Sequence, residues 1–144
     1  MVPLAGQGSY NPPPMNRRSV GSGVAWETEF GYSRATRIGD RILVSGTTAT
    51  GPEGPVAVGD PGEQTRYAIG KIRTAIESLG GALDDVVRTR IHVKPGTDWE
   101  AVARVHGEFF GAVRPACTLT YADLVGEDYL VEIEVEAVVG SSVA

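Results

Sequence analysis

The amino-acid sequence predicts one α+β domain in which two helices cover a single face of a mixed sheet. Residues 86–93 and 131–137 alternate in side-chain polarity with the period of a strand. Residues 61–79 and 98–110 repeat apolar side chains with the period of a helix. With two strands expected near the N-terminus and one after residue 114, the order is β-β-α-β-α-β-β. Two helices can cover only one side of such a sheet.

The chain has the length of one domain with its own core, at 144 residues. Its start contains Pro3, Pro12, Pro13 and Pro14, several glycines and few large apolar side chains. We therefore expect a poorly ordered N-terminal extension at residues 1–22 and a single domain at residues 23–140. The alternative for the extension is packing against a neighbouring subunit.

The first strands are expected as a hairpin. The chain becomes strand-like from Val24, with a short strand at residues 34–38 and a stronger one at residues 41–45. The Gly-Asp dipeptide between these strands is typical of a tight turn. Residues 46–59 are rich in Gly, Pro and Thr, and they predict a loop.

Both helices have recognisable ends. Asp60 is suited to cap the first helix, Pro61 suits its first position, and Glu63 completes a capping box. The two glycines at residues 80–81 end this helix. A second capping box at residues 97–100 starts the other helix.

The two alternating strands predict one apolar and one charged face of the sheet. The helix-facing side is expected to carry Val87, Thr89, Ile91, Val93, Val131, Ile133, Val135 and Ala137. The opposite side is expected to carry Arg88, Arg90, His92, Glu132, Glu134 and Glu136. Opposite charges on facing strands can pair. Such a face is too charged for a dry core, and it suggests an oligomer interface that retains water and charge.

The composition excludes several classes of protein. A formal net charge of −5 argues against a general nucleic-acid binder, which needs clustered Lys and Arg. No apolar run approaches the roughly 20 residues that span a bilayer, so no membrane association is expected. One cysteine rules out an internal disulfide and fits a reducing compartment, so we expect a cytoplasmic protein. No metal-ligand spacing is present, and we expect neither a metal nor a cofactor.

Short motifs follow one another along the domain in a specific order. They are Gly31-Tyr32-Ser33-Arg34-Ala35, Val44-Ser45-Gly46, Gln64-Thr65, Gly80-Gly81-Ala82-Leu83-Asp84-Asp85-Val86-Val87, Phe109-Phe110, Arg114-Pro115-Ala116 and Val131-Glu132-Ile133-Glu134-Val135-Glu136-Ala137. Over about residues 30 to 138, this series resembles the YjgF/Rid family of small α+β proteins. Each motif alone is weak, but the shared order and spacing are specific.

The resemblance implies a chorismate-mutase-like homotrimer. In this family the sheets form a central trimeric barrel, the helices lie outside, and three clefts form between subunits. The best-known activity is the hydrolysis of enamine or imine intermediates to a keto acid and ammonia. The implied partners are therefore a small-molecule substrate and two further copies of the chain.

The resemblance also implies site residues. Glu134 takes the position of a glutamate that positions water, Tyr32 that of a tyrosine in the cleft, and Gly46 that of a backbone group at a strand end. The neighbouring residues Thr47, Thr118 and Leu119 are expected to contribute to substrate binding. The family's carboxylate-binding arginine follows a Pro-Ala pair, and here that position is Cys117. A thiol cannot bind a carboxylate bidentately with a fixed charge.

Cys117 has three possible roles. Free cysteine is often a buried, inert filler at a strand start. In a cleft, it would instead be a nucleophile or a specificity element, with Glu134 as general base. A thiolate requires a lowered pKa, usually from a nearby cation or helix N-terminus. Arg114 is three residues away in sequence, and no histidine is expected beside Cys117.

The other site residues also have structural alternatives. Glu134 could be one of three barrel-lining carboxylates neutralised by Arg88 or Arg90. Tyr32 could be a hairpin aromatic. His92 and His106 are expected to be structural or surface residues rather than bases.

Three functions follow, in order of preference. The first is a hydrolase of the Rid type that acts on an enamine, imine or related C–N bond. The second is a non-catalytic protein that binds a small metabolite in the same cleft. The third is an RNA-cleaving or translation-inhibiting protein, which the acidic net charge disfavours.

Overall fold

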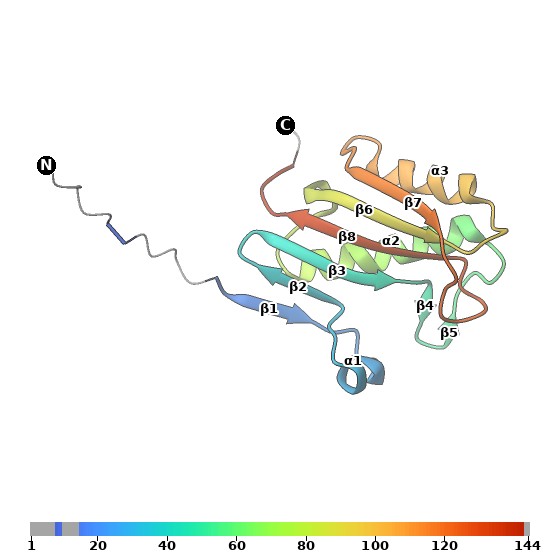
Figure 1. The fold of residues 1–144 in the computed structure, drawn as a ribbon, viewed down its shortest axis with the longest axis horizontal. Coiled ribbons are helices and arrows are strands. Elements are labelled where there is room, and N and C mark those ends of the chain that lie inside the picture. Colours follow the sequence, from blue (N-terminus) through green and yellow to red (C-terminus); the bar gives the residue numbers. More distant parts are fainter. Residues whose placement is uncertain (1–7, 10–14, 143–144) are drawn as a thin grey trace, which may run out of the picture.

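The computed structural model describes residues 8–9 and 15–142, and it contains one six-stranded mixed sheet with two long helices on one face (Figure 1). The strand order in the sheet is β1-β2-β3-β8-β6-β7. The elements are β1 (Arg17–Val20), α1 (Ala25–Phe30), β2 (Ala35–Ile38), β3 (Arg41–Thr47), β4 (Thr50–Gly51), β5 (Gly54–Pro55), α2 (Pro61–Ser78), the 3-10 turn η1 (Leu83–Asp85), β6 (Val86–Val93), α3 (Trp99–Phe110), β7 (Ala116–Tyr121) and β8 (Val131–Val138). The predicted α+β fold class is confirmed.

Strand β8 is the centre of the sheet. It pairs antiparallel with β3 on one side and with β6 on the other. Strand β7 pairs parallel with β6, because the α3 crossover returns the chain to the same end of the sheet. Every second residue of β8, from Val131 to Ala137, is buried.

The core lies between β3, β8 and β6 and the apolar stripe of α2. The main buried residues are Ile42, Val44, Ile69, Ile72, Ile76, Ile91, Val93, Val131, Ile133 and Val135. Helix α3 adds Val102 and Phe110. The predicted helix start is also confirmed, because the Asp60 side chain accepts a hydrogen bond from the Glu63 N–H at 3.1 Å.

One predicted core residue is wrong. Val87 was expected on the helix-facing side, but it is 39% exposed, and Val86 is 2% exposed instead. The register between β6 and β8 shifts between Val86 and Arg88. Such a bulge places two residues of one strand opposite one residue of its partner. The Val86 side chain therefore turns to the buried face, and Val87 turns to the exposed face.

The region from Val24, which was expected to be strand-like, begins with a helix. α1 includes Glu27, whose carboxylate accepts hydrogen bonds from the Ser22 N–H and hydroxyl. Gly31, at a φ of 76°, ends the helix in the left-handed conformation that glycine tolerates best. These local hydrogen bonds stabilise the helical turn.

Strand β1 lies inside the segment expected to be a poorly ordered extension. Its four residues pair with β2, and the Ser19 and Thr36 hydroxyls lie 3.0 Å apart. The unpaired edge of β2 offers backbone hydrogen bonds that satisfy β1, although β1 buries few side chains. Residues 1–7 and 10–14 of the expected extension lie outside the described residues.

The expected loop at residues 46–59 is partly regular. β3 continues to Thr47, and β4 and β5 form a two-residue ladder beyond it. A Cβ at Gly51 would lie 3.0 Å from the Tyr67 hydroxyl, so this small hairpin sits close to α2. Among the described residues, no helix is both long and apolar enough to cross a membrane.

The bulge in β6 gives a stability prediction. Val86→Ala removes buried methyl groups, and we expect it to lower the free energy of unfolding by roughly 2 kcal/mol. Val87→Ala is the matched control and is expected to cost less than about 0.5 kcal/mol. Urea denaturation measures both. The reverse order of the two losses would contradict the bulge.

Candidate functional site

The charged face of the sheet carries the candidate site. In the register between β6 and β8, Arg88 lies opposite Glu136, Arg90 opposite Glu134, and His92 opposite Glu132. All of these side chains project away from α2 and α3, because the alternate residues are buried beneath the helices. The predicted arrangement of opposite charges on this face is confirmed.

Glu134 is held between two basic side chains. Its Oε1 lies 3.6 Å from Arg90 Nη1 and 3.7 Å from His92 Nε2. These distances are longer than those of hydrogen bonds, and the Glu134 side chain remains 39% exposed. A shallow hollow of about 140 Å³, lined mainly by Leu43, Arg88, Arg90, Glu134 and Glu136, adjoins the carboxylate. The Glu134 carboxylate is therefore positioned by charge and open to a small molecule.

Gly46 lies against a second carboxylate of β8. A Cβ built at Gly46 would overlap Oε1 of Glu132 and lie 3.0 Å from its Cδ. The Gly46 carbonyl accepts a hydrogen bond from Arg34 Nη2. The β3–β8 register is irregular between Val44 and Thr47, so Gly46 sits at a bulge at the end of the regular pairing. A side chain at this position would have to displace the Glu132 carboxylate.

Arg34 links Gly46 to Tyr32. Burial lowers the pKa of the Arg34 guanidinium, while electrostatic interactions with Tyr32, Glu27 and Glu132 oppose this shift. Its Nε is buried and has no hydrogen-bond partner among the described residues. Tyr32 follows α1, where its N–H donates to the Glu27 carbonyl at 3.0 Å. The structure thus groups Tyr32, Gly46 and Glu132 around Arg34, a residue that sequence reasoning did not single out.

Cys117 projects from the other face of the sheet. It lies in register with Thr89 on β6, and the Thr89 side chain is fully buried beneath the helices. The next register pair places Thr118 beside Arg90, on the same face as Glu134. Within one chain, Cys117 and Glu134 therefore point to opposite sides of the sheet. Cys117 is nonetheless exposed, because β7 is an edge strand.

His106 of α3 lies close to the Cys117 segment. Its Nε2 is 2.9 Å from the Thr89 hydroxyl, and Thr89 is the register partner of Cys117. Burial lowers the pKa of His106, which favours the neutral imidazole at neutral pH. No sequence spacing indicated this neighbourhood, because α3 and β6 meet only through the fold.

The remaining expected substrate-binding residues are divided between the two faces. The Thr47 hydroxyl is buried and donates to the Ser45 carbonyl at 2.8 Å. The partly buried Leu119 side chain packs against the core. Only Thr118 shares an exposed surface with Glu134 in the same chain.

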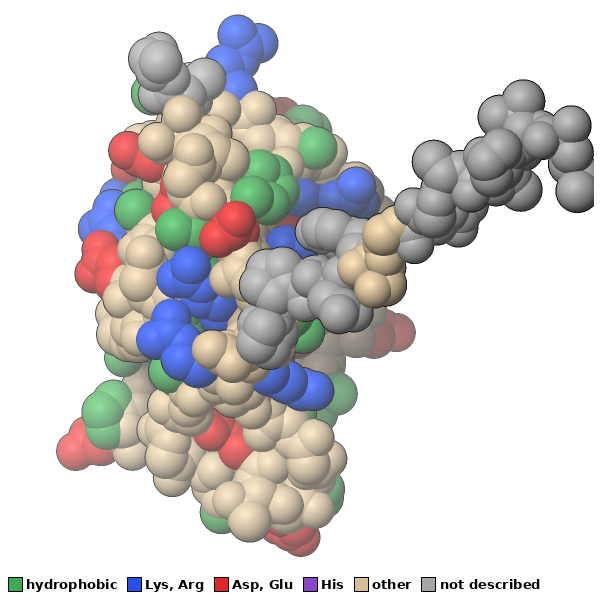
Figure 2. All heavy atoms as spheres, turned by 90° about the vertical axis from the view of Figure 1, so that its left-hand side faces the viewer, with side chains coloured by type: hydrophobic (Ala, Val, Ile, Leu, Met, Phe, Trp, Pro, Cys, Tyr) green, Lys and Arg blue, Asp and Glu red, His purple; other side chains and the backbone are tan. Residues whose placement is uncertain are grey.

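Basic side chains also gather at one end of the sheet. Figure 2 shows Lys and Arg side chains on the side of the molecule that contains the β2–β3 turn. Two arginines that pair in the β1–β2 register have structural partners, because Arg18 and Arg37 donate to the Leu79 carbonyl at 3.3 and 2.7 Å. They satisfy the C-terminal end of α2 and complement its dipole.

Comparison with known proteins identifies the family. The family model described as Endoribonuclease L-PSP matches residues 23–139. The chain belongs to this family, which is also called the YjgF/YER057c/UK114 family. A Mycobacterium tuberculosis member of known structure is 41% identical, with a TM-score of 0.78, and the match covers 86% of this chain and 100% of that one.

Two curated relatives are also similar to this chain. An uncharacterized protein of Streptomyces coelicolor is 42% identical over 86% of this chain and 93% of its own length. A RutC family protein of Pyrococcus abyssi is 34% identical over 72% of this chain and 82% of its own length. The family resemblance expected from the sequence motifs is confirmed.

The contact between Gly46 and Glu132 can be tested by a double-mutant cycle. We expect Gly46→Ala to destabilise the protein by roughly 1–3 kcal/mol, because the new Cβ displaces the Glu132 carboxylate. In a Glu132→Ala background, the same substitution should cost clearly less. Thermal unfolding of the four proteins measures the coupling. Additive losses would show that the two residues do not touch.

The lowered pKa of His106 predicts a dependence of stability on pH. The unfolded chain protonates His106 near its ordinary pKa of about 6.5, while the folded chain resists protonation to lower pH. Stability is therefore lost as the pH falls below about 6.5, towards the folded pKa. We expect His106→Gln to lose less stability than the parent between about pH 7 and pH 5, as measured by urea denaturation. His92→Gln is the control, since it leaves the contact between His106 and Thr89 intact.

Proposed function

We propose that this protein is a hydrolase of the Rid type that acts on an enamine, an imine or a related C–N bond of a small molecule. The observation that carries the proposal is the Glu134 carboxylate, exposed beside a hollow and held near Arg90 and His92. The chain that carries this Glu134 carboxylate belongs to the YjgF/L-PSP family. A positioned carboxylate is a common general base for water.

The proposed reaction adds water across a C=N bond. A water molecule gives a proton to the Glu134 carboxylate as its oxygen bonds to the imine carbon, and the imine nitrogen takes a proton from solvent. The C–N bond of the resulting carbinolamine then breaks after its nitrogen gains the proton held by Glu134. Loss of the hydroxyl proton leaves a carbonyl product and ammonia. Arg90 positions the carboxylate by electrostatic attraction, and the His92 ring lies on its other side.

We place the substrate in a cleft between subunits of a homotrimer. Cys117 and Glu134 lie on opposite faces within one chain, so they cannot reach one small molecule unless different chains supply them. An intersubunit cleft would join the exposed edge strand β7 of one chain to the group around Tyr32 and Gly46 of the next. The rest of the charged face of the sheet would then line the water-retaining centre of the assembly.

In this cleft, Gly46 would polarise the substrate through its backbone, and Cys117 would be a nucleophile or a specificity element. The exposure of Cys117 disfavours the role of a buried filler. The neutral imidazole of His106, near the Cys117 segment through Thr89, is a candidate to receive a thiol proton. The Thr47 and Leu119 side chains would act indirectly, by shaping the strand ends.

A second function is binding of a small metabolite without chemistry. The observation that favours it is the ion pairing of Glu134, because a carboxylate shared by two basic groups is also a purely structural arrangement. Cleavage of RNA, which the family description mentions, is less favoured by the net charge of −5. Recovery of intact ligand after prolonged incubation would distinguish binding from hydrolysis.

The assignment of Glu134 is tested by matched substitutions on β8. With imines generated in solution from small amino acids, we expect Glu134→Gln to reduce turnover by roughly 10²–10⁴-fold. Glu136→Gln, the same change two residues along the strand, should retain most activity. The release of ammonia measures both rates. Equal activity of the Glu134→Gln variant and the parent would rule out Glu134 as the base.

The role of Cys117 is tested by Cys117→Ser. A nucleophile would lose most of its kcat, whereas a specificity element would mainly change KM and the choice of substrate. We expect the change in KM, because a hydrolysis that uses Glu134 and water needs no covalent intermediate. A loss of kcat as large as that of Glu134→Gln would instead assign covalent catalysis to Cys117.

A further inference from the structure

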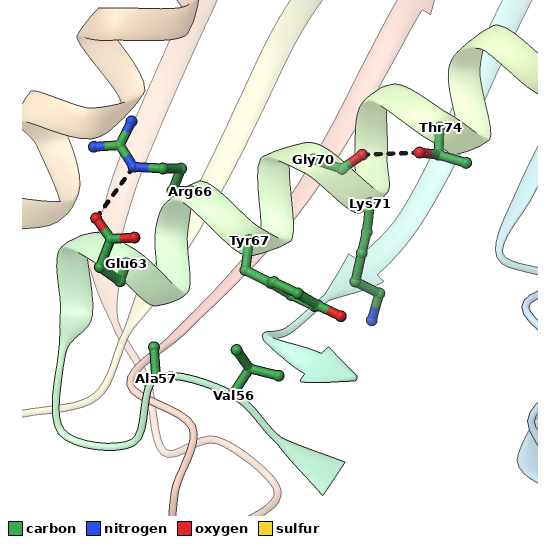
Figure 3. A pocket seen from close by; sticks show the side chains of 8 residues that line it. All are labelled: Val56, Ala57, Glu63, Arg66, Tyr67, Gly70, Lys71 and Thr74. Carbon is green, nitrogen blue, oxygen red and sulfur yellow. Dashed lines mark hydrogen bonds and ion pairs between the residues drawn. The ribbon is translucent and has the colours of Figure 1, made fainter. Parts of the chain in front are cut away.

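Helix α2 borders a hollow that the proposed chemistry does not use (Figure 3). It lies between α2 and the segment Val56–Ala57 and has a volume of about 420 Å³, within the usual range for small-molecule sites. Tyr67 and Lys71 line it from the helix. The hollow is separated from Glu134, because α2 and Glu134 lie on opposite sides of the sheet.

Gly70 keeps this hollow open. It lies in the interior of α2, where glycine is among the least favourable residues. A Cβ at Gly70 would have no heavy atom within 4 Å, so no packing in the chain requires a glycine there. By contrast, a Cβ at Gly51 or Gly81 would be crowded by neighbouring side chains. The space above Gly70 is therefore open.

The opposite wall is held in an unusual backbone conformation. Ala57 has a φ of 51°, in the left-handed region that non-glycine residues rarely adopt. The Val56 N–H donates to the Ala49 carbonyl at 2.8 Å, and the Ala57 carbonyl accepts from the Asp60 N–H at 3.0 Å. Such conformations persist where surrounding bonds enforce them, and they concentrate at ligand sites.

Lys71 supplies a charge at the end of the hollow. Its Nζ donates to the Thr48 and Thr50 carbonyls at 3.1 and 3.0 Å, which leaves one donor free. No carboxylate of the described residues lies within ion-pair distance of this half-buried amine, whereas Arg66 is already paired with Glu63 and Glu108. The positive charge of Lys71 is therefore available to an anion.

We propose that this hollow binds a small molecule that has a flat apolar body and one carboxylate. The body would lie on the Tyr67 ring, above Gly70 and against Val56, where the lining is mostly apolar. The carboxylate would accept the remaining hydrogen bond of Lys71 and balance its charge. A single donor suits a monoanion better than a phosphate, whose oxygens need several donors.

Titration of isotope-labelled protein with benzoate, followed by amide NMR, tests the proposal. We expect saturable shifts at Ala57, Gly70 and Lys71, with benzamide binding at least tenfold more weakly. Lys71→Met should weaken benzoate binding by tenfold or more. Gly70→Leu fills the hollow and should abolish binding. Gly107→Leu is the matched control, because Gly107 is also a helical glycine with nothing within 4 Å of a Cβ.

Several results would overturn the proposal. One is the absence of saturable amide shifts on titration with benzoate. Another is equal affinity for benzoate and benzamide. A third is a Gly70→Leu variant that binds benzoate as tightly as the parent protein. Shifts confined to residues around Glu134 would place benzoate in the proposed hydrolytic site instead. A change in oligomer mass caused by Gly70→Leu but not by Gly107→Leu, measured by light scattering, would identify the hollow as a contact between chains.

Discussion

The pairing of β8 with two antiparallel neighbours is the constraint on which the rest of the structure depends. Strands β3 and β6 pair with both edges of β8, so the β8 side chains can project only from one face of the sheet or from the other. Val131, Ile133 and Val135 take one face and require the cover that α2 provides. The three glutamates must then share the other face. A shift of the register by one residue would bury three carboxylates.

This division of the sheet also separates the two kinds of chemistry in the molecule. Glu134 lies with basic side chains on the open face, while Cys117 and His106 lie towards the helices. Glu134 and Cys117 of a single chain therefore cannot act on one small molecule together. The same geometry explains why the hollow on α2 is independent of the open face, since the whole sheet lies between them.

The central strands could be predicted from the sequence, because burial on one face and charge on the other imposes a period of two. The bulge at Val86 could not, since a register shift leaves no mark in the alternation itself. Helix α1 was missed because it is short and depends on the bonds of Glu27 to Ser22. Glu134 could be placed on its face from the pattern alone. The contacts of Arg34 with Gly46 and of His106 with Thr89 could not be predicted, because each contact joins different elements of the fold.

Hydrolysis by the Glu134 face is tested by the rate of ammonia release from small imines generated in solution, with and without the purified protein. We expect an enzyme-dependent rate that saturates with substrate and is independent of added metal ions. A carbonyl product should form in equal amount with the ammonia. Saturable binding of the imine, with release no faster than in buffer, would contradict the central claim that the Glu134 face carries out hydrolysis.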